Sequence, residues 1–273
     1  MAKQLKHQMI LLTGAASGIG AASARLAISL GYSVMLADIN LDGACEVAAS
    51  LGERAAAIKL DIRSASQWEQ ALATTTARFG QLDILINNAA IVCPGYARDV
   101  ALADHQRTID INFMGPLTGI LAGLRHFKQQ GHGHIVTVCS MTSFLPFPGI
   151  ASYGASKQAL RAMHHAVALE ERDSPIHFTI LHPTSTETPM LEQEAKHDAA
   201  ALAFVADAVT PDFVAETLFT AIRKKSVEVF MPPDQARSIR MLGTDPKKMR
   251  ALFGTMESIG RDTQLARRTE TVD

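Results

Sequence analysis

Tyr153 and Lys157 place a phenol and an ammonium group four residues apart in the segment Tyr-Gly-Ala-Ser-Lys. On a helix this spacing puts both side chains on one face, where they can act together. A free tyrosine has a pKa of about 10 and is a poor base at neutral pH. Because a neighbouring ammonium favours the phenolate, we expect the pKa of Tyr153 to be lowered toward the working range.

Ser140 lies thirteen residues before Tyr153, at the end of an apolar run that predicts a strand. Sheets of parallel strands bind ligands at the carboxyl ends of their strands, so the Ser140 hydroxyl is expected at the site. It could hold a substrate oxygen while Tyr153 exchanges a proton. A Tyr-x-x-x-Lys pair is common by itself, but this serine and the glycine-rich turn described next make the pattern specific.

The segment Thr13–Gly20 is a glycine-rich turn between a predicted strand and a predicted helix. Its glycines permit tight turning and close approach of the backbone to a pyrophosphate, and the helix presents free N–H groups to phosphates. No Lys-Ser/Thr pair follows, which argues against a triphosphate-binding loop. The alternative is that the glycines serve only the turn. We expect a dinucleotide to contact Gly14, Ser17, Gly18, Ile19 and Gly20.

The second predicted strand ends at Asp38. A carboxylate there accepts hydrogen bonds from the adenosine ribose hydroxyls and repels a 2′-phosphate. Ser17 and Ile39, which this geometry places beside the ribose, supply no cation for that phosphate. We therefore expect NAD rather than NADP, with the oxidised nicotinamide as a second cation beside the phenol. Asp61 and Ile62, at the end of the third strand, are expected near the adenine, although Asp61 could be a plain strand-end cap.

Short apolar runs alternate with longer amphipathic runs along the chain. The apolar runs predict strands at 8–14, 32–38, 55–61, 82–88, 133–140, 176–183 and 227–231. The amphipathic runs predict helices at 18–30, 41–50, 64–79, 100–129, 152–172 and 211–224. Strands that are apolar throughout suit a sheet covered on both faces. The alternation predicts one α/β domain over 1–273, with a doubly wound, Rossmann-type parallel sheet of seven strands.

Composition excludes several classes of protein. The 273 residues carry a net charge of −1 and are 47% hydrophobic, which argues against disorder and against nucleic-acid binding. Three scattered cysteines without a Cys-x-x-Cys pair predict a reducing compartment. No segment approaches the roughly 20 apolar residues that span a bilayer, and the run Met9–Leu12 is too short for a signal peptide. We expect a cytoplasmic protein without a membrane partner.

Taken together, these motifs are similar to those of the short-chain dehydrogenase/reductase family over about residues 8–190. The matching pieces are TGAASGIG at 13–20, Asp38, Asp61, NNAA at 87–90, Asn112, Ser140 and YGASK at 153–157. Two positions depart from the family pattern. Ala90 replaces the glycine of Asn-Asn-Ala-Gly, and Thr184 replaces the glycine of Pro-Gly. The extra methyl of Ala90 would shift the backbone near the cofactor.

The resemblance implies roles for further residues. It implies that Asn112 helps to hold a proton-relay water, that Lys157 binds the nicotinamide ribose, and that Asn88 supports the cofactor. It places Pro183 at the cofactor and a threonine at the nicotinamide carboxamide. Thr188 matches that threonine best, while Thr184 and Thr186 stay open. The family likeness also implies a homotetramer or homodimer built through the fourth and fifth helices.

The resemblance and the Ser140–Tyr153–Lys157 set predict an oxidoreductase that interconverts a secondary alcohol and a ketone. The loops expected over the reacting carbon are apolar, which suits a bulky hydrophobic substrate such as a steroid or a long-chain alcohol. They contain Cys93, Met141, Phe144, Leu145, Phe147, Ile150, Met190 and Leu191, some of which could be ordinary core residues. The alternatives are a non-catalytic NAD(H) sensor or scaffold and an epimerase or dehydratase that keeps its NAD.

Two other regions leave alternatives open. His182 ends the sixth strand and could touch the cofactor, although a structural histidine is favoured; no histidine spacing predicts a metal site. Residues 232–273 depart from the strand–helix alternation and form a C-terminal extension. Met249, Leu252, Phe253 and Met256 fall on one helical face there. A packed helix is favoured over a lid, a subunit contact or a membrane-surface segment.

Overall fold

The structure is a computed structural model that describes residues 8–270. The first seven and last three residues of the predicted single domain lie outside the described residues. Within the described range, no helix is both long enough and apolar enough to cross a membrane.

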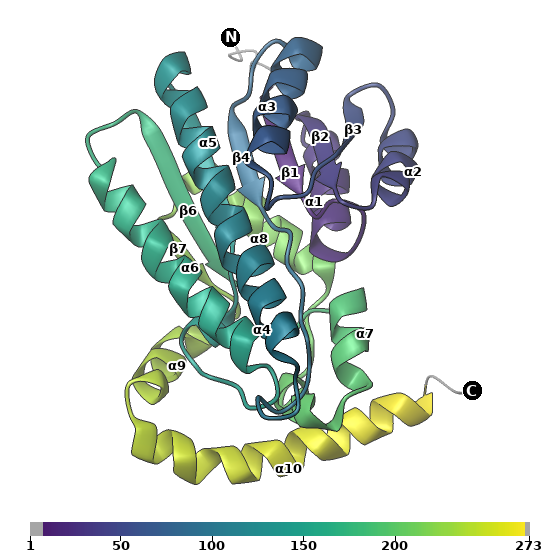
Figure 1. Cartoon of the computed structure of the whole chain (residues 1–273), viewed down its shortest axis with the longest axis vertical. Helices are drawn as coiled ribbons and strands as arrows, with labels where there is room; N and C mark the ends of the chain where they lie inside the picture. Colours follow the sequence, from purple (N-terminus) through teal and green to yellow (C-terminus); the bar gives the residue numbers. More distant parts are fainter. Residues whose placement is uncertain (1–7, 271–273) are drawn as a thin grey trace.

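A parallel sheet of seven strands forms the centre of the described chain, as the sequence predicts (Figure 1). The strands are β1 (Met9–Thr13), β2 (Ser33–Asp38), β3 (Ala55–Lys59), β4 (Ile84–Asn87), β5 (Gly133–Val138), β6 (Ile176–His182) and β7 (Glu228–Phe230). Their order across the sheet is β3-β2-β1-β4-β5-β6-β7. Every carboxyl end therefore points to the same edge, with the order reversing between β1 and β4. That reversal is where doubly wound sheets bind dinucleotides.

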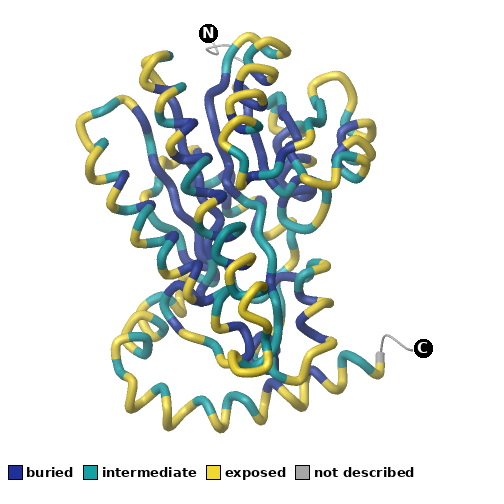
Figure 2. The backbone as a smooth tube through the Cα atoms, in the orientation of Figure 1, coloured by how far each residue is buried: buried dark blue, intermediate teal, exposed yellow. Residues whose placement is uncertain are grey.

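Both faces of the sheet are covered, which explains why its strands are apolar throughout. Ile10 and Leu12 of β1 pack with α1 (Gly18–Ser29), α2 (Leu41–Leu51) and α8 (Pro211–Lys224). Met9 and Leu11, whose side chains alternate with them, belong to the opposite core. That core includes α3 (Ala65–Phe79), α5 (Gly115–Gln130) and α6 (Ala151–Glu170). The buried strands between exposed helix faces are visible in Figure 2.

The helix predicted over 100–129 is interrupted. It consists of α4 (Leu102–Ile109), a π-helical segment Asp110–Met114 and α5. π-Helical turns are rare and recur at functional sites, and this one contains the buried Asn112. The interruption was not predicted, although Pro116 just after it is a signal in the sequence: proline has no N–H for the i→i−4 bond to the Asn112 carbonyl.

Three further segments were not predicted as separate elements. They are α7 (Pro189–Ala195), the 3-10 segment Asp198–Phe204 and, in the C-terminal extension, α9 (Ala236–Gly243). The helix expected around Met249 is α10 (Pro246–Glu270), which crosses the end of the molecule beneath α7 and α9 (Figure 1). Gln264 of α10 donates hydrogen bonds to the carbonyls of Glu194 and His197, at 3.1 and 2.9 Å. One side of α10 is thus packed. Leu252, which was predicted on the packed face, is 45% exposed and does not lie on that side.

The glycine-rich turn is packed too tightly for side chains at two positions. Gly14 has a φ of +67°, in the region that favours glycine. A Cβ on Gly20 would lie 2.0 Å from the carbonyl oxygen of Gly14, which is backbone and cannot swing away. Gly20 therefore lets the first turn of α1 lie directly against the end of β1.

We predict that Gly20→Ala lowers the free energy of unfolding by about 3 kcal/mol, because the added methyl must displace the backbone of the turn. Urea denaturation measures the change. Gly254→Ala is the control, since a Cβ at that exposed position of α10 meets nothing within 4 Å. There alanine should raise stability by about 0.5–1 kcal/mol. An unchanged midpoint for Gly20→Ala would contradict the packing described here.

Candidate active site

A cavity of about 510 Å³ opens at the carboxyl edge of the sheet. It is lined by most of the residues predicted for the site, from its cofactor part and its catalytic part alike. These are Gly14, Ser17, Gly18, Ile19, Asp38, Asp61, Ile62, Asn88, Ser140, Tyr153, Lys157, Pro183 and Thr188. Gly20 and Asn112 do not line the cavity. They support its wall, Gly20 through the packing of the glycine-rich turn and Asn112 through its bonds to Ile91.

Ser140 and Tyr153 meet where β5 ends. Ser140 follows β5 in extended conformation, and its Oγ accepts hydrogen bonds from the N–H and the hydroxyl of Thr142, at 3.1 and 3.0 Å. A hydrogen bond also joins its side chain to that of Tyr153. Tyr153 and Lys157 lie one turn apart on α6, as their spacing predicts. The serine hydroxyl is therefore fixed by Thr142 and placed beside the phenol.

The pKa of Tyr153 is raised in this structure, whereas the sequence led us to expect it to be lowered. Burial of the phenol is the largest cause, and the negative charge of Glu194 is the next. The hydrogen bond with Ser140 acts in the opposite direction but is weaker. Lys157 does not reverse this balance: its Nζ lies 5.6 Å from the centre of the Tyr153 ring and donates to the Val138 carbonyl at 3.2 Å. Burial also lowers the pKa of Lys157.

The Asn112 side chain holds the loop that follows β4. Its Nδ2 donates to the carbonyl of Ile91 at 2.8 Å, and its Oδ1 accepts from the N–H of Ile91 at 2.9 Å. Ile91 in turn lines the cavity. Both polar ends of the side chain are thus engaged with one backbone residue, so Asn112 positions the cavity wall. A contact between Asn112 and a relay water stays a prediction.

Asn88 supports the glycine-rich turn from the adjacent strand. Its Nδ2 donates to the carbonyls of Thr13 and Gly14 at 2.9 and 3.2 Å, and its N–H donates to the Thr13 hydroxyl at 3.0 Å. These bonds tie the end of β4 to the end of β1. On the other side of the turn, a Cβ on Gly18 would lie 3.0 Å from Cγ2 of Thr188. Thr188 thus lies across from the turn, while Thr184 and Thr186 also line the cavity.

The other end of the cavity carries Asp38 and Asp61. The Asp38 carboxylate accepts hydrogen bonds from the N–H groups of Ala16 and Asn40, at 3.0 and 2.9 Å. Asp61 instead pairs with Arg63, whose Nε and Nη2 reach its carboxylate at 2.9 and 2.6 Å. This hydrogen bond is the main reason that the pKa of Asp61 is lowered. Arg63 lines the cavity but was not predicted, because nothing in its spacing links it to the site.

The glycine cradle, the acidic group at the end of β2 and the buried Tyr–Lys pair meet the requirements of a nicotinamide dinucleotide site. Known proteins bear this out. The model of the family described as short chain dehydrogenase matches residues 8–199. The chain belongs to the short-chain dehydrogenase family.

Several curated relatives share this family. A 3-beta-hydroxysteroid dehydrogenase of Comamonas testosteroni is 34% identical over 194 residues, which cover 70% of this chain and 76% of that protein. A 3-alpha-(or 20-beta)-hydroxysteroid dehydrogenase of Mycobacterium tuberculosis is 33% identical over 192 residues, covering 70% of this chain and 74% of that one. The predicted oxidoreductase class is therefore confirmed at the level of the family.

Two solved structures have a fold similar to that of this chain. A 3-ketoacyl-(acyl-carrier-protein) reductase from Brucella melitensis, complexed with NADH, is 28% identical with a TM-score of 0.75 over 83% of this chain and 96% of that chain. A short-chain dehydrogenase/reductase from Burkholderia phymatum, in complex with NAD, has a TM-score of 0.82 over 89% of this chain and 95% of that one. The second is only 21% identical and shows the likeness of fold alone.

The substrate part of the cavity of this short-chain dehydrogenase differs from expectation. Met141, Phe147, Ile150, Met190 and Leu191 line it as predicted, but Cys93, Phe144 and Leu145 do not. The ring of Phe144 packs at 4.9 Å from that of His182 and at 5.0 Å from that of Phe230, on the far side of the serine loop. The cavity also contains an acidic residue that the sequence gave no reason to single out. Glu194 is buried there, and burial raises its pKa to about 7.

His182 has the structural role that the sequence favoured, and it acts on the serine loop. Its Nδ1 lies 2.8 Å from the Ser143 hydroxyl and 3.2 Å from the Ser140 carbonyl, while its Nε2 lies 3.0 Å from a carboxylate oxygen of Glu228. Glu228 was not predicted, because it is one residue of a short strand at the sheet edge and nothing in its spacing links it to the site. The histidine thus links β7 to the backbone of Ser140.

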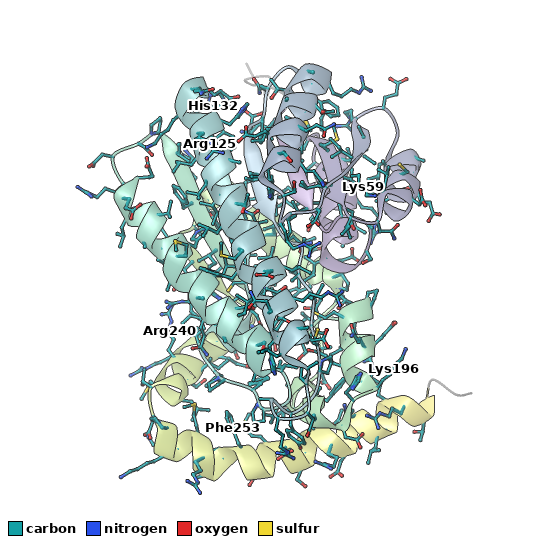
Figure 3. The ribbon with its side chains drawn as sticks, in the orientation of Figure 1. Lys59, Arg125, His132, Lys196, Arg240 and Phe253 are labelled. Carbon is teal, nitrogen blue, oxygen red and sulfur yellow. The ribbon has the colours of Figure 1, made fainter. Side chains whose placement is uncertain are left out.

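Besides His182 of β6, Glu228 pairs with side chains from α6 and α9. Arg161 and His165 of α6 reach its Oε1 at 2.8 and 3.0 Å. Arg240 of α9, which is labelled in Figure 3, reaches its Oε2 at 2.8 Å. Burial opposes ionisation of this carboxyl, but the hydrogen bonds from His182, Arg161 and His165 outweigh it and lower its pKa. Glu228 therefore joins the C-terminal extension to the helix that carries Tyr153.

We predict that Glu228→Gln lowers the free energy of unfolding at pH 7 by about 2 kcal/mol, since charge-assisted hydrogen bonds are lost. A lowered carboxyl pKa gives stability that is present above the ordinary pKa and is lost as the pH falls. The difference between variant and wild type should therefore shrink below about pH 4.5. Urea denaturation across this range measures it. Glu216→Gln, at an exposed position of α8, should change stability by less than about 0.5 kcal/mol; an equal loss there would contradict the assignment.

Proposed function

We propose that this short-chain dehydrogenase is an NAD-dependent enzyme that interconverts a hydrophobic secondary alcohol and its ketone. The observation that carries the proposal is the hydrogen bond between Ser140 and Tyr153 in the cavity that also contains the glycine-rich turn. That arrangement puts an acid–base group beside the place where a dinucleotide fits.

In this proposal Ser140 orients the substrate oxygen, and Tyr153 moves the proton. In the oxidative direction the Tyr153 phenolate would accept the hydroxyl proton, and a nicotinamide held in the same cavity would supply the acceptor for the hydride. In the reductive direction the neutral phenol donates that proton to the carbonyl oxygen. The nicotinamide supplies the redox chemistry, while the chain supplies placement and electrostatics. Burial holds the Tyr153 phenol neutral, so the positive charge of the oxidised nicotinamide would be needed to favour the phenolate.

The lining of the adenosine end supports NAD as the cofactor. The carboxylate of Asp38 faces the cavity with backbone N–H groups fixing both of its oxygens, and it would repel a 2′-phosphate. The cavity lining includes Arg63 and Arg107, and the guanidinium of Arg63 is engaged with Asp61. The structurally similar 3-ketoacyl-(acyl-carrier-protein) reductase from Brucella melitensis is complexed with NADH.

Hydrophobic substrates are supported by two observations. Side chains at the substrate part of the cavity are largely apolar, among them Phe147, Ile150 and Met190. Two of the curated relatives are named as hydroxysteroid dehydrogenases, whose substrates have a bulky apolar frame. A homodimer or homotetramer built through the predicted helices 100–129 and 152–172 is supported by large exposed apolar residues on α4, α5 and α6, namely Leu102 at 83%, Leu121 at 43% and Leu169 at 67% exposure. A cytoplasmic location stays a prediction.

Tyr153→Phe should lower kcat/KM for alcohol oxidation at least about 100-fold, because the group that exchanges the proton is lost. NAD affinity should change less than about threefold, since the ring itself stays. Nicotinamide absorbance and NAD titration measure the two effects. Tyr96→Phe is the control, because its hydroxyl pairs with Glu257 at 3.0 Å and Tyr96 does not line the cavity. Equal alcohol turnover by wild type and Tyr153→Phe would contradict the acid–base role of Tyr153, whereas NAD binding without turnover in either protein would indicate the non-catalytic NAD(H)-binding alternative.

Asp38→Asn should reduce the preference for NAD over NADP in kcat/KM at least about tenfold, because the negative charge that repels a 2′-phosphate is removed. Steady-state kinetics with both cofactors measures the ratio. Asp42→Asn, an exposed position in the first turn of α2, should leave the ratio unchanged. A wild-type enzyme that uses NADP as efficiently as NAD would show the cofactor assignment to be wrong.

A further inference from the structure

Glu194 is a buried carboxyl group inside the substrate part of the cavity. It lies on α7, it lines the cavity, and only 8% of it is exposed. Its backbone carbonyl accepts hydrogen bonds from the Gln264 side chain and the His197 N–H, both at 3.1 Å. The main chain of Glu194 is thus fixed by α10 on one side, while the residue borders the cavity on the other.

The surroundings of the Glu194 carboxyl are apolar. Met190 lies one helical turn earlier on the same face of α7 and packs with Ile150 and Tyr153. Leu191 and Ala195, beside it in sequence, are buried as well. In the described part of the chain, no side chain forms a hydrogen bond or an ion pair with this carboxyl, and burial is the cause of its raised pKa. A carboxyl in such a place is costly unless a partner satisfies it.

Glu194 is also close enough to the reacting group to influence it. Its negative charge is the largest electrostatic cause of the raised pKa of Tyr153. Ser140, Tyr153 and Glu194 line one cavity, so a substrate held at one oxygen by the first two has room to reach Glu194 with another part. The carboxyl would meet a second position on that substrate.

The chemistry of the partner follows from the carboxyl group. An acidic group on the substrate would be repelled by the carboxylate, and a plain hydrocarbon would leave the carboxyl unsatisfied. An ammonium group would require Glu194 to be fully ionised in an apolar setting. A hydroxyl group can donate to the carboxylate and can also accept from the neutral acid. It suits a carboxyl in either protonation state, which a pKa of about 7 makes relevant near neutral pH.

We propose that Glu194 binds a second hydroxyl group of the substrate and thereby selects apolar diols, or hydroxyketones in the reverse direction, over simple alcohols. This inference rests on the proposed alcohol dehydrogenase function and specifies its substrate class. Glu194 is a specificity residue in this scheme, and the proton transfer itself remains with Tyr153.

The test compares matched pairs of alcohols that differ by one hydroxyl group: the cyclohexanediols with cyclohexanol, and androstanediol with androstanol. The pairs cover short and long separations between the two oxygens. In the wild type, kcat/KM with NAD should favour a diol at least about tenfold in one or both pairs. Glu194→Met should abolish that preference by weakening diol turnover alone. Glu194→Gln, whose amide can still bind a hydroxyl, should retain most of it.

Two further measurements make the outcome decisive. Glu192→Met alters an exposed carboxyl on the same helix and should leave the preference as in the wild type. Calorimetric titration of the same alcohols into the NADH-loaded enzyme reports binding without turnover, so it covers the case of slow oxidation. Equal binding and equal kcat/KM of diol and simple alcohol by the wild type would overturn the role of Glu194, as would an unchanged preference in Glu194→Met.

These results are distinct from a failure of the proposed function. If wild type oxidises simple alcohols but not diols preferentially, the dehydrogenase assignment stands and the inference about Glu194 is wrong. If wild type oxidises no alcohol and binds diols no better than simple alcohols, both are wrong. Tighter binding of diols without turnover would support the Glu194 contact and contradict the dehydrogenase assignment.

Discussion

The hydrogen bond between Ser140 and Tyr153 depends on the placement of two elements at one edge of the sheet. Ser140 lies at the end of β5, and Tyr153 lies in the first turn of α6, so the bond forms only where the strand and the helix meet. The hydroxyl groups of Thr142 and Ser143 and the ring of His182 hold the backbone and side chain of this serine loop. The reactive pair is thus supported by a polar network within an apolar core.

Burial governs the ionisable groups of the site. The phenol of Tyr153, the ammonium of Lys157 and the carboxyl of Glu194 all lie in surroundings that disfavour charge, so the neutral form of each is favoured relative to water. Glu228 is the contrast, because hydrogen bonds from cationic side chains overcome its burial. Burial therefore favours the neutral forms of the groups at the site, whereas hydrogen bonds from cationic side chains keep Glu228 ionised as an anchor for the C-terminal extension.

The C-terminal extension has a direct structural link to the site. Its helix α9 contacts Glu228, which is bonded to His182 beside Ser140, and its helix α10 bonds to the carbonyl of Glu194. Figure 3 labels Arg240 on α9 and Lys196 just after α7, which mark the two ends of this connection. The favoured packed helix is present, and it lies against the segments that border the substrate part of the cavity.

The sequence by itself determined the parallel sheet, the glycine-rich turn and the set Ser140, Tyr153 and Lys157. Periodicity and fixed spacing along the chain encode these features, since strand, turn and helix follow one another directly. Tertiary structure decided which charges face the site. Glu194 and Glu228 are distant in sequence from Tyr153 and His182, which they influence, and their positions depend on how α7 and β7 pack. Tertiary structure also set the direction of the Tyr153 pKa shift, because burial and the field of Glu194 arise only when the chain has folded.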